Sequence, residues 1–577
     1  MTKILLVAVN ASYSHTSLSV RELCEYVKAQ YIPDLEIDFR ELTINQPFGD
    51  ILREIAVYEP NVVLFSTYIW NGEIICKIIT DLKKILPDVI IGCGGPEFGF
   101  SAEKSLKSLK SLDFIMKGEG EKILAEISEL AISEFDFMYG VKYIKGIFFR
   151  GSGEEIIYTG DMELISNLSR LPFPYPFLKN KETITEEEKN HKIYYYESSR
   201  GCPFSCSYCM SSVERSVRFM PLERVFRDLQ IFLDSGVSLV KFVDRTYNIN
   251  PDRYIAIWDY IVKHHNGKTM FHFEIEGEFL SDEALDFLQT VPEGVMQFEI
   301  GVQSSNKKTL RAVSRSDNTE KLAANILRIP PSIHKHLDLI AGLPYEDMES
   351  FGMSFDYVMS LKPDALQLGF LKVLSGTAME KYALAEGWKW MENPVYETFS
   401  TPYMSYKDML FLKDVEVAVD AYWNSGVFGS IMGYIGRKVS LWQFFKTFTS
   451  LSESKGVFSD ARRETFWFGL FAQWINELGD FENILDKDVL YDLLRYDFII
   501  RGKQGNFPQW YSHVYNKERH RAMLEADGGI TNARLDFGHS EYEVFDYNVD
   551  APEPENCKGQ YEKLIRYKAN NSFLHNK

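Results

Sequence analysis

The feature that most constrains the fold of this chain is an alternation of short apolar segments with amphipathic stretches, which occurs in two separate series. In the first series, strands are expected at residues 4–9, 35–39, 62–66, 89–92 and 114–116. Helices are expected between them, near residues 19–30, 49–58, 72–86 and 102–109. Such alternation predicts an α/β domain over residues 1–150, with a parallel, doubly wound, Rossmann-like sheet that binds ligands at the carboxyl ends of its strands.

A second series begins at Ile193 and stops near residue 380. Its strands are expected at residues 193–197, 239–243, 270–275, 295–301, 336–340 and 365–370. A closed barrel needs about eight strand–helix units, so this shorter series predicts an open, partial (β/α)6 barrel over residues 193–384. Residues 151–192 join the two series. A hairpin is expected around residues 144–158, and the segment Leu171-Pro-Phe-Pro-Tyr-Pro-Phe177 and the charged run 179–192 are interpreted as linker.

Residues 385–577 have a different character, because they are rich in Trp, Phe and Tyr and follow a mostly helical period. We expect a mostly helical domain whose tryptophans, such as Trp467 and Trp474, lie in its core. The acidic, proline-broken segment 546–555 is typical of a solvated strap.

Charge and cysteine content exclude several classes of protein. The formal net charge of −19, from 63 basic and 82 acidic residues, disfavours a general binder of nucleic acids or anionic membranes. Seven cysteines in 577 residues cannot form the disulfide scaffold of a small secreted protein. The N-terminal apolar run is interpreted as a strand rather than a signal peptide, and no stretch reaches the roughly 18 apolar residues of a membrane span. These features predict a soluble, cytoplasmic, multidomain protein.

Three of the cysteines, Cys202, Cys206 and Cys209, lie close together after the first strand expected in the barrel. Barrel enzymes keep their active sites at this end of their strands. Thiolates at this spacing can hold three irons of a [4Fe–4S] cluster and leave one iron open. A structural zinc site would need four closed ligands, and the sequence offers no fourth cysteine or nearby histidine.

The motif Cys-x-x-x-Cys-x-x-Cys, with the aromatic Tyr208 before its last cysteine, resembles the signature of the radical S-adenosylmethionine (SAM) superfamily. The flanking Glu-Ser-Ser-Arg-Gly and Met-Ser-Ser are similar to the subgroup with an N-terminal cobalamin domain. The resemblance implies that the amino and carboxylate groups of SAM chelate the open iron. It also implies that an electron, supplied by a donor such as flavodoxin or ferredoxin, cleaves SAM to a 5′-deoxyadenosyl radical.

Later strand ends in the barrel are similar to the family's SAM-contacting segments. His272, Glu274 and Glu276 are expected on one face of the third strand by the two-residue period. The residues that the resemblance assigns to SAM are Tyr208, Asp244, Arg245, Glu274, Gln303, Ser304 and Gly342.

The strand ends of the first domain are small and polar, and they resemble those of cobalamin-binding domains. Glycines there let a large ligand approach the backbone. The residues assigned to cobalamin are Asn10, His15, Ser66, Thr67, Tyr68, Gly94, Gly95, Pro96, Glu97, Gly118, Glu119 and Gly120. The Asp-x-His-x-x-Gly loop that supplies a histidine to cobalt in many cobalamin proteins is absent. His15 is thus expected to bond cofactor amides or backbone, with cobalt ligation as the alternative, and Tyr68 or Trp70 is expected beneath the corrin.

The resemblance implies a radical SAM enzyme, and methylation of an unactivated carbon is the commonest chemistry of the subgroup. Two alternatives stay open. One is a radical rearrangement, ring contraction or cyclisation without methyl transfer, and the other is a cobalamin or redox sensor. The sequence identifies no catalytic side chain, and a small molecule, a lipid or a peptide could be the substrate.

Overall fold

The computed structural model describes most of the chain. The described residues are 1–133, 135–153, 155–180, 184–453, 457, 462–501 and 507–512, with the strands β18 (Tyr542–Phe545) and β19 (Lys563–Arg566). They belong to two compact units, of which residues 1–347 and 369–405 form the first and residues 348–368 and 406–577 the second. The segment 546–555 lies outside the described residues.

The N-terminal part of the first unit contains a seven-stranded sheet with the order β2-β1-β3-β4-β5-β6-β7. Its strands are β1 (Thr2–Asn10), β2 (Leu35–Thr43), β3 (Val62–Ser66), β4 (Ile90–Gly94), β5 (Phe114–Met116), β6 (Ile147–Arg150) and β7 (Ile156–Tyr158). Strands β1 to β5 pair in parallel, whereas β6 pairs antiparallel with both β5 and β7. The doubly wound sheet and the hairpin near residues 144–158 are therefore confirmed.

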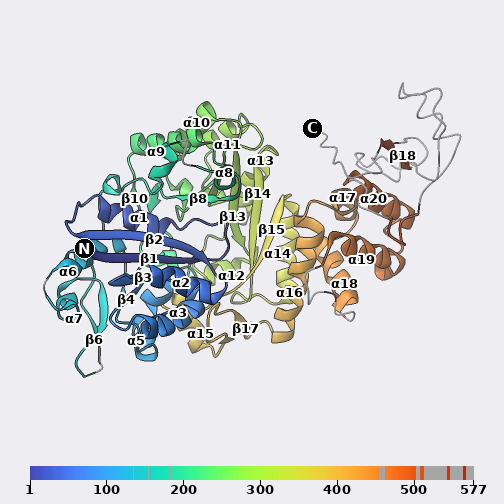
Figure 1. Cartoon of the computed structure of the whole chain (residues 1–577). Coiled ribbons are helices and arrows are strands. Elements are labelled where there is room, and N and C mark those ends of the chain that lie inside the picture. Colours follow the sequence, from blue (N-terminus) through green and yellow to red (C-terminus); the bar gives the residue numbers. More distant parts are fainter. Residues whose placement is uncertain are drawn as a thin grey trace. The chain divides into compact units, whose positions relative to one another are not determined.

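Helices cover both faces of this sheet because its strands are apolar on both sides (Figure 1). These helices are α1 (Leu18–Lys28), α2 (Phe48–Val57), α3 (Gly72–Ile85), α4 (Pro96–Phe100), α5 (Ala102–Ser108), α6 (Gly120–Ile132) and α7 (Phe137–Gly140). Helices α1 and α6 share one core with the sheet, and α2, α3 and α5 share the other. The winding of the sheet reverses between β1 and β3, so a ligand crevice is expected at the carboxyl ends of these strands.

The segment between the two sheets is better ordered than a linker. Tyr175, from the proline-rich stretch, is buried, and its hydroxyl donates to the Tyr195 carbonyl at 2.9 Å. The charged run 179–192, interpreted as linker, contains the helix α8 (Glu186–His191). That helix forms because Thr185 and Glu188 make a capping box, which satisfies backbone groups that a short charged helix would otherwise expose.

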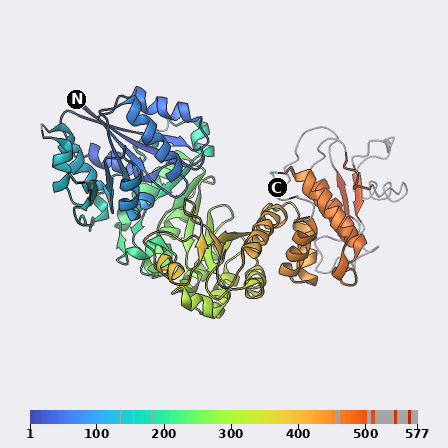
Figure 2. The same cartoon turned by 90° about the horizontal axis from the view of Figure 1, so that it is seen from below.

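The second sheet has six strands in the order β15-β14-β13-β12-β11-β8, with β15 and β8 at its open edges. The strands are β8 (Ile193–Tyr196), β11 (Leu239–Phe242), β12 (Met270–Ile275), β13 (Met296–Gln303), β14 (His334–Ala341) and β15 (Ala365–Phe370). The pairs from β8 to β14 are parallel, which confirms the partial barrel. The helices of this region are α9 (Leu222–Ser235), α10 (Pro251–His264), α11 (Asp282–Leu288), α12 (Lys307–Ala312) and α13 (Thr319–Arg328), seen from below in Figure 2.

Residues 369–405 complete the first unit with α15 (Ala378–Ala385) and the short strands β16 (Lys389–Trp390) and β17 (Thr398–Ser400). The second unit is mostly helical, as expected. Its described helices are α14 (Met348–Ser360), α16 (Tyr406–Val419), the π-helix Asp420–Asn424, α17 (Gly429–Lys438), α18 (Leu441–Glu453), α19 (Glu464–Asn476) and α20 (Lys487–Ile500). Trp474 is buried among Phe444, Phe448 and Phe471, so aromatic side chains build this core. Within the described ranges, no helix is both long and apolar enough to cross a membrane.

Candidate active site

The three clustered cysteines lie on one loop of the first unit, between β9 (Ser199–Arg200) and β10 (Arg218–Phe219), which pair antiparallel and close the base of the loop. The thiols of Cys202, Cys206 and Cys209 are all free of disulfides. The N–H of Cys209 donates to the Cys206 carbonyl at 3.1 Å, so the chain turns tightly between these two ligands. Three free thiols on one tight loop are the donor set that a [4Fe–4S] cluster takes from such a protein.

The loop is narrow where it begins. Gly201 has a φ of +99°, and a Cβ at this position would lie 2.1 Å from the carbonyl oxygen of Ser216. Only glycine fits such a close approach of two backbone segments. The next residue, Cys202, donates its N–H to the Glu214 carbonyl at 3.0 Å, which ties the first cysteine to the returning arm of the loop.

Asp244, which sequence reasoning assigned to SAM, lies at the end of β11 and is only 1% exposed. Its carboxylate accepts hydrogen bonds from the N–H and Oγ of Ser198, at 2.6 and 2.5 Å, and from the N–H of Ser199, at 3.0 Å. Burial raises the pKa of Asp244 to about 6, against the lowering effect of these bonds. The structure therefore gives Asp244 an anchoring role, because it fixes the backbone that leads into the cysteine loop. Its neighbour Arg245 is exposed.

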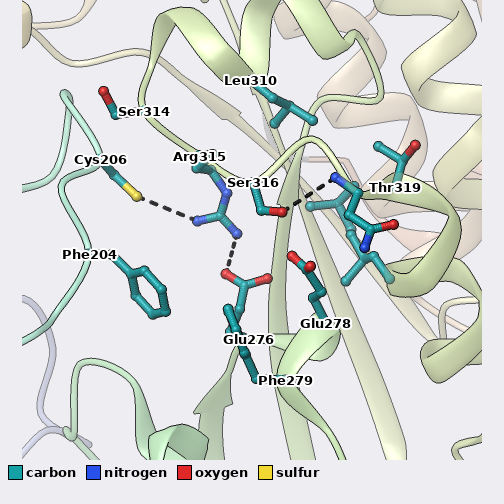
Figure 3. Close-up of a pocket in the computed structure, with 13 residues that line it drawn as sticks. Phe204, Cys206, Glu276, Glu278, Phe279, Leu310, Ser314, Arg315, Ser316 and Thr319 are labelled. Atoms are coloured by element: carbon teal, nitrogen blue, oxygen red, sulfur yellow. Dashed lines mark hydrogen bonds and ion pairs between the residues drawn. The ribbon is translucent and has the colours of Figure 1, made fainter.

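Arg315 is a site residue that sequence reasoning missed. Its guanidinium donates to Glu276 Oε2 at 2.6 Å and to the Gly301 carbonyl at 2.6 Å, and its Nη1 lies 3.9 Å from Cys206 Sγ (Figure 3). Phe204, Phe279 and other side chains line the same pocket. Hydrophobic periodicity could not identify Arg315, because this residue lies in the loop after α12. The one available signal was a carboxylate, Glu276, just beyond the end of a barrel strand.

A second charged cluster joins side chains of β11, β12 and β13. Lys241 Nζ is 3.0 Å from Glu299 Oε2 and 3.4 Å from Glu274 Oε1. His272 accepts a hydrogen bond from Gln297 on Nδ1, so its Nε2, 3.0 Å from Glu299 Oε2, is the donor to that carboxylate. Burial alone would raise the pKa of Glu299, but the His272 hydrogen bond and the Lys241 charge lower it to about 2.

This cluster confirms part of the expected geometry of the third strand. His272 and Glu274 do share one face, and together with Glu299 they bring ligand atoms within 4.8 Å of one another. The Lys241 ammonium already supplies a cation to both carboxylates. Glu276 differs from the expectation, because β12 ends at Ile275 and the Glu276 side chain pairs with Arg315 instead.

Two residues at the ends of the fourth and fifth barrel strands have a positive φ, and one of them also has a buried side-chain oxygen without a partner among the described residues. Gln303 has a φ of +69°, and its buried Oε1 lacks a hydrogen-bond partner among the described residues. Ser304, which is fully buried, donates to Glu346 Oε1 at 2.6 Å. Gly342 has a φ of +87°, a conformation that favours glycine. A buried amide oxygen without a partner is a position that a ligand donor can complete.

Tyr208 lies between the second and third cysteines and packs against a buried hydrophobic cluster that includes Val313 and Leu343. Burial raises the pKa of its phenol, so the side chain is neutral. Tyr208 therefore supports the cysteine loop from its protein side.

In the N-terminal domain, the segments after β3 and β4 are joined to each other. The N–H and Oγ1 of Thr67 both donate to the Gly94 carbonyl, at 2.7 and 2.8 Å, and Thr67 is fully buried. A Cβ on Gly95 would lie 2.4 Å from the Thr67 carbonyl oxygen. Thr67 and Gly95 thus shape the crevice, whereas Ser66, which is partly exposed and bonded to Ser19 at 3.0 Å, lies at its wall.

Several polar side chains assigned to cobalamin have protein partners instead. Asn10 donates to the His15 carbonyl at 2.9 Å. Glu97, in the first turn of α4 after Pro96, accepts a hydrogen bond from the Tyr396 hydroxyl. Glu119 is bound by arginines of the cysteine loop. These bonds fix the orientation of the three side chains, and their assignment to cobalamin stays a prediction.

His15 is likewise turned toward the barrel. Its Nδ1 shares a 2.6 Å hydrogen bond with the Tyr195 hydroxyl on β8, and its backbone forms a bridge with Ile193. In the structure His15 thus has a side-chain partner on β8, and its expected bonding to cofactor amides or backbone stays a prediction. Tyr68 stacks on Trp70 with ring centroids 4.4 Å apart, and Trp70 is 43% exposed, so an aromatic platform stands beside the crevice.

One glycine beside the crevice, Gly118, leaves room for a large group. Gly118 has a φ of +94°, and a Cβ there would meet no atom within 4 Å. Gly120 begins α6, and Gly94 ends β4. Open backbone beside small side chains fits the broad ring and tail of cobalamin. On the barrel, the Arg315 guanidinium and the unpartnered Gln303 oxygen fit the carboxylate and a donor group of SAM.

Three family models match the chain. The B12 binding domain matches residues 4–128, the radical SAM superfamily matches residues 196–358, and a protein of unknown function, DUF4080, matches residues 385–565. The first two matches confirm the resemblance carried by the cysteine motif and by the strand ends of the first domain.

Curated relatives cover the two sheet domains. An uncharacterized methyltransferase of Pyrococcus horikoshii is 23% identical over 354 residues, which are 59% of this chain and 72% of that protein. The cobalamin-dependent radical SAM methyltransferase TokK of Streptomyces tokunonensis is 26% identical over 310 residues, 51% of this chain and 44% of TokK. An anaerobic magnesium-protoporphyrin IX monomethyl ester cyclase of Rubrivivax gelatinosus is 23% identical over 353 residues, 60% and 62% of the two chains. The chain thus matches less than two thirds of the length of the last two relatives.

Solved structures share the fold. The cobalamin-dependent SAM radical enzyme OxsB, with aqua-cobalamin and SAM bound, has a TM-score of 0.57 at 15% identity and covers 92% of this chain and 82% of its own. The radical SAM methyltransferase TsrM from Kitasatospora setae, with cobalamin and a [4Fe–4S] cluster bound, has a TM-score of 0.53 at 15% identity. The match covers 69% of this chain and 79% of TsrM. At these identities the likeness establishes the architecture alone.

Proposed function

We propose that this chain, a radical SAM enzyme with an N-terminal B12 binding domain, methylates an unactivated carbon of its substrate. Its cofactors are a [4Fe–4S] cluster, SAM and cobalamin. When bound, the cluster supplies the electron that cleaves SAM and cobalamin carries the methyl group to be transferred.

The observation that carries the proposal is the direct contact between the loops at the carboxyl ends of the two sheets. Glu119, which follows β5, binds arginines at the base of the cysteine loop, which follows β8; Glu97, after β4, bonds Tyr396 in the turn between β16 and β17. Methyl transfer to a substrate radical requires both cofactors to face one substrate, and contact between their loops favours this arrangement.

The chain's own residues hold and orient the reactants. Cys202, Cys206 and Cys209 would hold the cluster, and Arg315, beside Cys206, would bind the SAM carboxylate as a guanidinium binds carboxylates elsewhere. Gln303 would place a hydrogen-bond acceptor against the nucleoside part of SAM. The Tyr68–Trp70 stack would border the bound cobalamin and help to exclude water from it.

The substrate is proposed to be polar. Strands β11, β12 and β13 bring together the charged or polar side chains of Lys241, His272, Glu274 and Glu299, which favours a small molecule or a peptide over a lipid. A flavodoxin- or ferredoxin-like donor would supply the electron. The oxygen sensitivity of an open [4Fe–4S] cluster fits a reduced cytoplasm.

The test is anaerobic reconstitution with iron, sulfide and hydroxocobalamin, followed by incubation with a low-potential chemical reductant, SAM carrying a labelled methyl group and a fractionated small-molecule extract. A product one CH2 heavier that carries the label supports methylation. A product of unchanged mass, formed with release of 5′-deoxyadenosine, contradicts it.

A second candidate is cyclisation without methyl transfer, which the similarity to the protoporphyrin ester cyclase favours. The same measurement separates the two functions, because only methylation carries the label into the product.

A further inference from the structure

Two arginines that face each other across the base of the cysteine loop bind the same glutamate of the N-terminal domain. Arg200 on β9 and Arg218 on β10 are register partners. Glu119 Oε1 lies 2.5 Å from Arg218 Nη2 and 3.3 Å from Arg200 Nη1, and Glu119 Oε2 lies 3.2 Å from Arg218 Nη1. A single carboxylate therefore bridges both arms of the loop that carries the cysteines.

The three side chains of this bridge are largely shielded from solvent. The side chains of Arg200, Arg218 and Glu119 are 16%, 12% and 12% exposed. Two guanidinium groups facing each other at such low exposure repel, and the shared carboxylate offsets that repulsion. Glu121, which follows in the same segment, also binds Arg200, at 2.8 Å. Arg200 also binds Glu197 at 2.7 Å and Arg218 binds Glu214 at 2.7 Å, so carboxylates of both domains hold the base of the cysteine loop.

Glu119 is itself held in a defined orientation. The N–H of Ile165 donates to Glu119 Oε2 at 2.9 Å, and Arg218 donates to the Ile165 carbonyl at 2.6 Å. In the same backbone segment, Gly118 has open space where a Cβ would be. One short segment therefore borders the crevice proposed for cobalamin and also clamps the cysteine loop.

We infer that Glu119 is a positioning residue that couples occupancy of the cobalamin crevice to the rigidity of the cluster loop. The inference rests on the proposed function, because it takes cobalamin as the ligand of that crevice. A ligand that orders the segment around Gly118 fixes Glu119, which in turn fixes Arg200 and Arg218. Because coupling between two sites is reciprocal, an ordered cluster loop also strengthens cobalamin binding.

The experiment is hydrogen–deuterium exchange of the full chain, reconstituted with its cluster, with and without hydroxocobalamin. The reporter is the peptide covering residues 199–220. In the wild-type protein, cobalamin is expected to slow exchange in this peptide by about fivefold or more. In Glu119→Gln, which keeps the size of the side chain but loses its charge, the slowing is expected to fall below about twofold.

Two further variants make the test specific. Glu73→Gln removes an exposed carboxylate that pairs with Lys77 on α3 of the same domain, so it should behave like wild type. Arg218→Lys keeps the positive charge but loses the guanidinium group that binds both carboxylate oxygens of Glu119. Cobalamin should therefore slow exchange in this variant as little as it does in Glu119→Gln. Cobalamin binding is measured separately by its absorbance after gel filtration.

Wild type that binds cobalamin without slower exchange in residues 199–220 would overturn the coupling and leave the proposed function standing. So would a Glu119→Gln protein that responds as wild type does. Wild type that retains no cobalamin would overturn the coupling and the proposed function together.

Discussion

Replacing Asp244 tests whether this residue anchors the cysteine loop or contacts SAM through its charge. In Asp244→Asn, the amide oxygen can accept the two backbone N–H groups of Ser198 and Ser199, and the amide nitrogen can donate to Ser198 Oγ, so all three hydrogen bonds survive. Asp244→Ala leaves these three groups without an acceptor in a site that is 1% exposed. At about 1 kcal/mol for each bond, Asp244→Ala should cost about 3 kcal/mol.

The pH dependence of stability separates the two variants further. Folding raises the pKa of Asp244 from 3.8 to about 6, so the folded state binds its proton more tightly than the unfolded state does. The stability that this gives is fully present below about pH 4 and is lost as the pH rises through about 6, in total about 3 kcal/mol. Between about pH 5 and pH 8, wild type should therefore lose about 1.4 kcal/mol more than Asp244→Asn.

The assay is thermal unfolding of the two variants and wild type under anaerobic conditions at both pH values, with 5′-deoxyadenosine formation measured alongside. We expect Asp244→Asn to match or exceed the stability of wild type at pH 8 and to retain SAM cleavage. If Asp244→Asn keeps its fold but no longer cleaves SAM, or is as unstable as Asp244→Ala, the anchoring role is refuted and the charge itself is needed.

Other predictions concern the remaining buried groups. Arg315→Met should weaken SAM binding by about tenfold or more, and adding Glu276→Gln should restore stability but not affinity; equilibrium dialysis that shows unchanged affinity in Arg315→Met would rule out a carboxylate-binding role. The pKa of Glu299 is lowered to about 2, so the stability it gives is present above about pH 4.5 and is lost as the pH falls through about 2. Lys241→Met should lower the free energy of unfolding by about 1–2 kcal/mol at neutral pH, and that free energy should fall less on acidification than in wild type, as measured by urea unfolding. An unchanged loss of stability on acidification would contradict the ion pair. Tyr175→Phe removes a buried hydroxyl that bonds β8 and should cost about 1–3 kcal/mol in the same assay, whereas no loss would show that the proline-rich segment is not anchored there.

Most of the fold was predictable because its signals are periodic. Strands β3, β5, β12 and β15 occur at the predicted residues, since each is a short apolar run bounded by polar or turn residues. The cysteine motif was predictable because its ligands are close in sequence. The helix α8 was missed because its stability comes from the cap that Thr185 makes with Glu188, not from an apolar face.

The partners of site residues were less predictable, since they depend on contacts between distant segments. Asp244 faces Ser198 because β8 and β11 are neighbours, and Glu119 faces Arg218 because two domains meet there. The sequence placed both carboxylates at strand ends and so near a ligand. It could not show that protein donors already satisfy them. Arg315 carried no local signal at all, because its role arises from the loop that returns it to Cys206.

The most direct test of the central claim is reduction of the protein reconstituted with cluster and cobalamin in the presence of SAM, with 5′-deoxyadenosine and S-adenosylhomocysteine measured together. We predict that both products form and that both are lost in Cys206→Ala. Protein that holds both cofactors but forms neither product, or forms them equally in Cys206→Ala, would contradict the account.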